Sequence, residues 1–264
     1  MRKFIFFLLS LALFTVTAQA KVVGEVVNYR DHGVVMKGYL AYDTGIKAKR
    51  PGVLVVHEWW GLNDYARKRA TMLAEMGYTA LALDMYGDGK TAEHPNEAGK
   101  FATEVNKNMP LAQSRFEAGR KFLVAHKTVA QGQIAAIGYC FGGGVVLNMA
   151  RLGAPLKAVA SFHGALTTAT PAAPGKVKAR IAIYTGADDA MVPKAQVDAF
   201  VKEMESAGVD YRLVSYPGAK HSFTNPDADR LGKQFNLPIA YNAAADQDSW
   251  TQLGTFLAAV FGPR

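Results

Sequence analysis

The 264-residue sequence has little cysteine, and this scarcity argues against two kinds of chemistry. Cys140 is the only cysteine, so the chain cannot close an internal disulfide. A thiol-based redox cycle is disfavoured as well, because no second cysteine is present to resolve an oxidised intermediate. A lone cysteine is often a small buried hydrophobe, so the residues around Cys140 have to decide its role.

Repeats, low-complexity stretches and a basic stripe are also missing. The absence of repeats and of biased composition excludes solenoid and disordered classes. The 30 basic residues outnumber the 22 acidic ones, but they are scattered singly or in pairs such as Lys49-Arg50. Without a basic stripe interleaved with aromatic residues, nucleic-acid binding has little support. We interpret the basic residues as a solvated surface.

A long apolar run occurs only near the N-terminus. Arg2-Lys3 precedes the apolar run from Phe4 to Phe14, and small residues follow up to Ala20. A basic start, a short apolar stretch and an Ala-x-Ala ending are typical of a secretory signal peptide. The alternative, a retained membrane anchor, is weaker because the run is too short to span a bilayer. We expect cleavage after Ala20, a mature domain over residues 21–264 and an exported protein, periplasmic where the cell has two membranes.

The mature sequence predicts an α/β fold in one domain. Half of the residues are apolar, and strand-like apolar runs alternate with helical patterns, which favours a mostly parallel central sheet flanked by helices on both faces. The expected strands cover residues 22–29, 34–41, 51–56, 79–83, 133–139, 158–162, 180–184 and 211–216. The expected helices cover residues 63–76, 111–126 and 142–150, a segment from residue 193, and residues 240–260. We expect residues 85–110 to form a loop that leads into helical turns.

The strongest chemical signal surrounds Cys140. The sequence from Gly138 to Gly142 has the form Gly-x-Cys-x-Gly and lies where a buried strand ends and a helix begins. A nucleophile there occupies a tight turn that needs flanking glycines, and the helix N-terminus behind it favours a thiolate and a developing oxyanion. The alternative is an ordinary strand-to-helix turn with a buried cysteine. We interpret Cys140 as the nucleophile.

Candidate partners for the nucleophile follow the last two expected strands. His221 lies in the loop after the last strand, where this chain order places a general base. Asp189 lies in the loop after the preceding strand and could orient the imidazole. Its neighbour Asp188 is the obvious alternative. An aspartate that caps the following helix and a surface histidine are the plainer interpretations.

A third group of candidates follows other strands at the same expected edge. Glu58 comes directly after a buried strand, where desolvation would raise its pKa and suit it to proton transfer; a glutamate paired with a basic side chain is the alternative. We expect the backbone N–H of Trp59 to donate to the oxyanion, together with the helix N-terminus at Phe141. Trp60 could line the pocket or pack in the core, and His163 could line the pocket or make a structural hydrogen bond.

Six motifs together resemble the dienelactone hydrolase family, over nearly all of the mature chain. They are His57 to Gly61, Asp84 to Asp88, Gly138 to Gly142, Ser161 to Gly164, Gly186 to Pro193, and His221 to Phe223. The resemblance implies a single α/β-hydrolase domain that needs neither metal nor cofactor. It implies a triad of Cys140, Asp189 and His221, and a Glu58 that contacts the resting thiol and takes its proton when substrate arrives. We also expect Tyr86 to lie at the pocket.

The family resemblance predicts hydrolysis of a small-molecule ester or lactone through a thioester, by a protein that we expect to be a monomer. Family members that act on dienelactone are expected to grip its carboxylate with arginines. Here the corresponding stretches read Thr224-Asn225-Pro226 and Gly87 to Lys90, without arginine, so the natural substrate stays open. A non-catalytic exported binding protein that keeps the pocket is the alternative, and the intact set of catalytic candidates argues against it.

Overall fold

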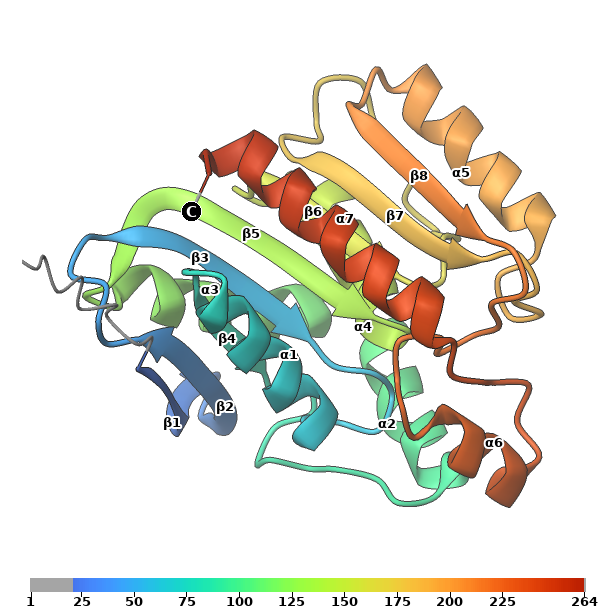
Figure 1. The fold of residues 1–264 in the computed structure, drawn as a ribbon, viewed down its shortest axis with the longest axis horizontal. Coiled ribbons are helices and arrows are strands. Elements are labelled where there is room, and N and C mark those ends of the chain that lie inside the picture. The colour runs from blue at the N-terminus through green and yellow to red at the C-terminus, as the bar shows by residue number, and fades with distance from the viewer. Residues whose placement is uncertain (1–20, 264) are drawn as a thin grey trace, which may run out of the picture.

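A central sheet of eight strands organises residues 21–263, which are the residues that the computed structural model describes. The strands are β1 (Val22–Asp31), β2 (Val34–Asp43), β3 (Arg50–Val56), β4 (Thr79–Leu83), β5 (Val129–Tyr139), β6 (Ala158–Phe162), β7 (Arg180–Gly186) and β8 (Tyr211–Tyr216). Their order across the sheet is β1-β2-β4-β3-β5-β6-β7-β8 (Figure 1). The pairs that include β2 are antiparallel and the other pairs are parallel. The predicted fold class is confirmed, while the predicted signal peptide lies outside the described residues.

Helices cover both faces of this sheet. They are α1 (Asp64–Glu75), α2 (Pro95–Asn106), α3 (Met109–Ala125), α4 (Phe141–Arg151), α5 (Lys194–Ser206), α6 (Ala228–Phe235) and α7 (Ala243–Phe261). In Figure 1, α1 and α7 cross the face of the sheet that is turned toward the viewer. None of the described helices is both long and apolar enough to cross a bilayer.

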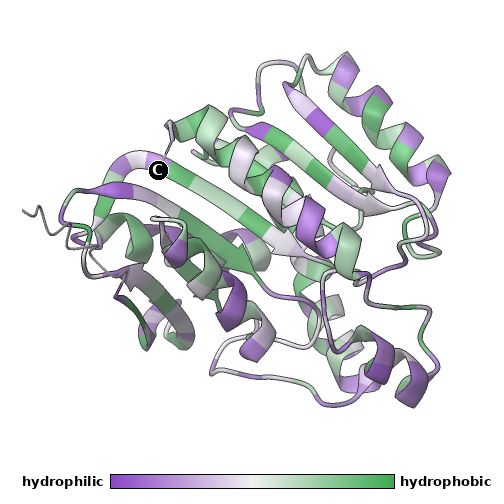
Figure 2. Ribbon diagram, viewed as in Figure 1, coloured by the Kyte–Doolittle hydropathy of each residue, from purple (hydrophilic) through white to green (hydrophobic). Residues whose placement is uncertain are grey.

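Alternate residues of each central strand build two separate apolar cores, one on each face of the sheet. In β3, Val53 and Val55 belong to the core that α1 and α7 cover, whereas Leu54 and Val56 belong to the core shared with α3, α4 and α5. All seven residues of β3 are buried, as expected for a strand covered on both faces. Figure 2 shows the central strands as largely apolar and the outer helices as mixed.

The sequence predicted one of the smaller helices in outline and missed another. Residues 85–110 are predicted to form a loop that leads into helical turns, and α2 supplies these turns, with Pro95 in its first turn. Proline is favoured there because that position needs no N–H donor. Helix α6 was not predicted: its apolar residues Ala228, Leu231, Gly232 and Phe235 share one face, but eight residues are too few for a helical period to be recognised from the sequence.

The parallel strands all end at one edge of the sheet, and this edge carries the candidate residues. Glu58 follows β3, Cys140 follows β5, His163 follows β6, Asp189 follows β7 and His221 follows β8. Ligands of open α/β sheets bind outside the carboxyl ends of the strands. The fold therefore brings these candidates to the edge where chemistry is expected.

Candidate active site

Cys140 occupies a sharp turn between β5 and α4. Its backbone has φ +51° and ψ −114°, a conformation that is costly for a residue with a side chain. The flanking glycines make this turn feasible: a Cβ on Gly138 would lie 2.1 Å from the carbonyl oxygen of Gly142, and one on Gly142 would lie 2.3 Å from that of Val56. The thiol is thereby presented at the N-terminus of α4.

His221 and Asp189 form a buried pair beside this turn. Nδ1 of His221 lies 2.8 Å from Oδ2 of Asp189. The other carboxylate oxygen accepts the backbone N–H groups of Met191 (2.8 Å) and Val192 (3.1 Å). Asp189 is therefore fixed from both sides, whereas its neighbour Asp188 is exposed. The structure thus brings Asp189, of the two aspartates, to the histidine.

Electrostatics couple His221 to Cys140. Burial alone would lower the pKa of His221, but the negative charge of Cys140 and the hydrogen bond with Asp189 outweigh it and raise this pKa to about 10. Nε2 of His221 is buried and no other described residue hydrogen-bonds to it, which leaves it free to interact with the sulfur of Cys140. Cys140 and Asp189 together favour the protonated form of the His221 imidazole.

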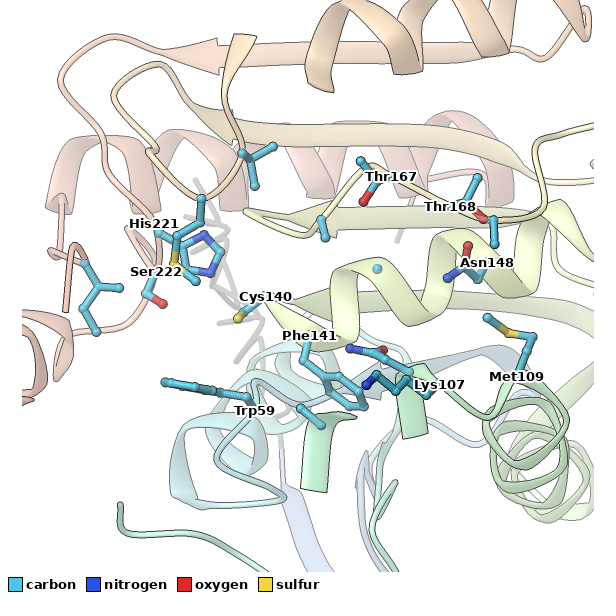
Figure 3. Close-up of a pocket in the computed structure, with 18 of the residues that line it drawn as sticks. Trp59, Lys107, Met109, Cys140, Phe141, Asn148, Thr167, Thr168, His221 and Ser222 are labelled. Carbon is cyan, nitrogen blue, oxygen red and sulfur yellow. The ribbon is translucent and has the colours of Figure 1, made fainter. Parts of the chain in front are cut away.

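A cavity of about 800 Å³ opens at these two side chains. Figure 3 shows Cys140 and His221 at one end, with Trp59 and Phe141 beside the thiol. Apart from His221, the lining contains one charged side chain, Lys107, and none from aspartate, glutamate or arginine. A cavity of this size accepts a small organic molecule.

Two residues that line the cavity have a backbone N–H without a partner in the described part of the chain. Within residues 21–263, no hydrogen bond engages the N–H of Trp59 or of Phe141. Phe141 is the first residue of α4, and the first N–H groups of a helix have no acceptor inside it. Both residues line the cavity, and their N–H groups are the ones that the sequence predicts as oxyanion donors.

Glu58 lies behind this cavity, in contact with the loop that carries His221. Oε1 accepts a hydrogen bond from the hydroxyl of Ser222 (3.0 Å), and Oε2 accepts one from the side-chain amide of Asn225 (2.6 Å). Burial raises the pKa of Glu58, and these two bonds, followed by the charge of His221, oppose that rise. No hydrogen bond joins Glu58 to Cys140 among the described residues.

The remaining pocket candidates lie outside the cavity lining. Trp60 packs against Phe235 and is 5% exposed. Tyr86 donates its hydroxyl to the carbonyl of Trp59 (2.9 Å) and packs beneath Phe141. His163 is fully buried and makes hydrogen bonds to backbone and side chain. These three residues support the site from behind.

Sequence reasoning missed the residues that fasten the loop after His221. Ser222 and Asn225 hold Glu58 as described, and the hydroxyl of Thr224 lies 2.7 Å from Nε2 of His163. Arg69 donates to the carbonyl of Thr224 (2.6 Å) and to Asp246 (2.5 Å). One signal was available, because Arg69 falls on the same stripe of α1 as the buried Ala66, Ala70 and Leu73.

Nothing in the described part of the chain offers a metal site, since no group of three or more histidine, cysteine, aspartate or glutamate side chains is gathered as metal ligands would be. The chemistry that this site supports is nucleophilic attack by a thiolate. Cys140, His221, Trp59 and Phe141 line one cavity, and Asp189 holds His221 from outside the lining.

Comparison with known proteins places this geometry in a family. The chain is 29% identical over 229 residues to Protein usf of Aquifex pyrophilus, covering 83% of this chain and 97% of that protein. It is 30% identical over 207 residues to an Aquifex aeolicus protein provisionally named a carboxymethylenebutenolidase, covering 76% and 87%. A crystal structure titled as a dienelactone hydrolase-like promiscuous phosphotriesterase from metagenomic libraries superposes with a TM-score of 0.85 at 33% identity, covering 92% of this chain and all of that one. The family model described as "Dienelactone hydrolase family" matches residues 36–261. The chain therefore belongs to the dienelactone hydrolase family, and it is a hydrolase with an α/β-hydrolase fold.

Proposed function

We propose that this protein hydrolyses carboxylic esters or lactones through a thioester formed on Cys140. The observation that carries the proposal is the meeting of Cys140 with the His221–Asp189 pair at one end of a single cavity. Membership of the dienelactone hydrolase family and the provisional name of the Aquifex aeolicus relative support the same substrate class.

Acylation begins with the thiolate of Cys140. Its sulfur attacks the carbonyl carbon, and the N–H groups of Trp59 and Phe141 hold the oxyanion that forms. When the tetrahedral intermediate collapses, the bond from carbon to the alcohol oxygen breaks. The departing oxygen takes the proton of the His221 imidazolium. For a lactone the released hydroxyl stays attached to the acyl group.

In deacylation His221 acts as a general base instead of a general acid. Neutral His221 removes a proton from water, and the resulting hydroxide attacks the thioester carbon. The carbon–sulfur bond then breaks, which releases the carboxylic acid and restores the thiolate beside the imidazolium. Asp189 holds the proton on Nδ1 throughout, so Nε2 always faces the reaction.

The decisive experiment replaces the nucleophile. Cys140→Ala should reduce hydrolysis of a chromogenic ester by more than about a thousandfold, while circular dichroism shows an unchanged fold. A panel of esters and lactones assayed on the mature protein would define the preferred acyl and alcohol groups. Hydrolysis by Cys140→Ala within about tenfold of wild type would refute the assignment.

The protein is further proposed to act outside the cytoplasm, because residues 2–20 have the pattern of a cleaved signal peptide. Secreted material from the native host should begin at Lys21 when its N-terminus is sequenced. Exported protein that retains Met1 would contradict this part of the proposal.

A further inference from the structure

His163 contacts both catalytic segments without reaching the substrate cavity. It follows β6, has φ +40° and is fully buried. Its Nδ1 lies 3.1 Å from the backbone nitrogen of Cys140, and its Nε2 lies 2.7 Å from the hydroxyl of Thr224, three residues beyond the general base. The ring also packs edge-to-face against His221, with 5.3 Å between ring centroids.

We propose that His163 is a positioning residue that fixes the backbone of Cys140 and ties it to the loop of His221. The proposal rests on the proposed function, because it assigns His163 a role in the same reaction.

The hydrogen bonds define one tautomer of this imidazole. The backbone nitrogen of Cys140 can only donate, so Nδ1 of His163 must be the acceptor. Nε2 then carries the hydrogen and donates it to the hydroxyl of Thr224. Burial, reinforced by the charge of His221, lowers the pKa of His163 well below its ordinary value. The ring thus stays neutral and keeps its acceptor at the pH where the enzyme works.

The turn at Cys140 needs this acceptor because its backbone is strained. Non-glycine residues in such conformations cost on the order of 1–3 kcal/mol and persist only when their surroundings hold them. The N–H of Cys140 is shared between the carbonyl of Phe162 (3.0 Å) and Nδ1 of His163. The next peptide supplies the oxyanion donor of Phe141, so a shift of the turn would move both the sulfur and that donor.

The other end of the imidazole meets a segment that is itself fixed. The hydroxyl of Thr224 also bonds the hydroxyl of Tyr65 (2.5 Å), and its carbonyl accepts from the buried Arg69 (2.6 Å). His163 therefore connects the nucleophile to an anchored segment of the loop that begins at His221. A misplacement of about 1 Å between reacting groups can cost about 100-fold in rate.

Two conservative variants separate the two hydrogen bonds of His163. In His163→Asn the amide oxygen occupies roughly the place of Nδ1 and can still accept from Cys140. In His163→Gln the longer side chain reaches Thr224 but leaves a methylene group opposite the N–H of Cys140. His163→Leu removes both bonds, and His126→Gln is the control, because it changes a histidine whose bond to Thr128 (2.8 Å) lies in the loop before β5.

The measurements are ester kinetics and the pH dependence of thiol alkylation by iodoacetamide, on full-length mature protein. We expect kcat to fall about tenfold or more in His163→Gln and His163→Leu, with KM within about twofold of wild type. His163→Asn should recover most of this loss and His126→Gln should be unaffected. The alkylation profile should shift in the two impaired variants, because the sulfur moves relative to His221.

Equal activity in His163→Asn and His163→Gln, or an unchanged alkylation profile in His163→Gln, would overturn the proposal. If His163→Leu does not fold, the comparison of the Asn and Gln variants still decides. A failure of the proposed function looks different, because Cys140→Ala would then hydrolyse the ester at the rate of the wild type.

Discussion

At the scale of single residues, the role of Glu58 is open to a direct kinetic test. The family resemblance predicts that Glu58 takes the proton of the thiol, whereas in this structure its two oxygens accept from Ser222 and Asn225. No hydrogen bond joins Glu58 to Cys140 among the described residues, so proton transfer would require the carboxylate to move toward the sulfur. We expect Glu58→Gln to slow acylation, because glutamine keeps the shape but cannot take the proton.

Single-turnover kinetics with a chromogenic ester measure this step. The initial burst should diminish in Glu58→Gln by more than substrate binding weakens. In His221→Gln both the burst and the later phase should collapse, because His221 protonates the departing alcohol in acylation and activates water in deacylation. A wild-type burst in Glu58→Gln would restrict Glu58 to holding the loop through Ser222 and Asn225.

Two buried histidines should make the fold sensitive to acid. Burial lowers the pKa of His57 to about 4 and that of His163 well below its ordinary value. Below pH 6.5 the unfolded chain binds protons at these two histidines, whereas the folded chain does not. Their contribution to the free energy of unfolding is therefore fully present above pH 6.5 and is lost as the pH drops toward 4. For His57, a pKa difference of about 2.5 units corresponds to about 3 kcal/mol.

Urea denaturation at pH 7, 5 and 4 would show this loss as a falling midpoint. His57→Gln removes one titrating group, while its side chain can still bond to neighbouring backbone. Its midpoint should therefore fall less steeply between pH 7 and pH 4 than that of the wild type. An identical pH dependence in the two proteins would show that His57 contributes no acid sensitivity.

At the scale of elements, α1 anchors the catalytic loop through Arg69. This side chain is 4% exposed, pairs with Asp246 of α7 and donates to the carbonyl of Thr224. Removing one partner of a buried ion pair costs about 3–5 kcal/mol, because the other charge is left unpaired. Arg69→Met should therefore lower the thermal midpoint markedly, as differential scanning calorimetry would record.

A double variant provides the control for this prediction. In Arg69→Met with Asp246→Leu neither charge is left alone, so part of the lost stability should return. Activity should remain impaired in both proteins, because the carbonyl of Thr224 has lost its donor. If the single variant melts like the wild type, Arg69 does not anchor the loop.

The helices and strands that were predicted correctly are those whose apolar residues recur at a regular spacing or form a continuous run. Strand β3 is a run of apolar residues buried on both faces, and the stripe of α1 follows helical spacing, so both were expected close to their observed bounds. Helix α6 has only eight residues, fewer than the stretch over which a helical period can be recognised. Periodicity also gave no information on the loop after His221, because its contacts with Glu58 and His163 join residues far apart in the chain.

At the scale of the whole molecule, the catalytic edge was predictable because it follows from topology. The carboxyl ends of parallel strands lie at one edge of the sheet. Cys140, Asp189 and His221 each follow such a strand, so they could be grouped before any contact was known. Which side chains face the cavity could not be derived in the same way. Trp60, Tyr86 and His163 sit at that edge, yet side-chain packing directs them behind the cavity.

The charge of the cavity predicts which esters the protein prefers. Lys107 at the end of α2 lines the cavity and makes no salt bridge within the described residues, and no acidic side chain lines the cavity. A substrate carboxylate near Lys107 would gain about 1 kcal/mol in a solvent-exposed setting, which corresponds to about fivefold in kcat/KM. We therefore expect chromogenic esters that carry a carboxylate to be hydrolysed faster than neutral esters of equal length.

Lys107→Gln tests this expectation against a matched variant. It should remove the advantage of the charged ester and leave the neutral ester unchanged, whereas Lys100→Gln, on the same helix but outside the cavity lining, should alter neither. Raising the ionic strength to about 0.5 M should shrink the advantage in the wild type, because exposed charges are screened. Carboxylates placed on the acyl chain and on the alcohol would show which part of the substrate approaches Lys107. Equal rates for charged and neutral esters at low salt would mean that the cavity does not select by charge.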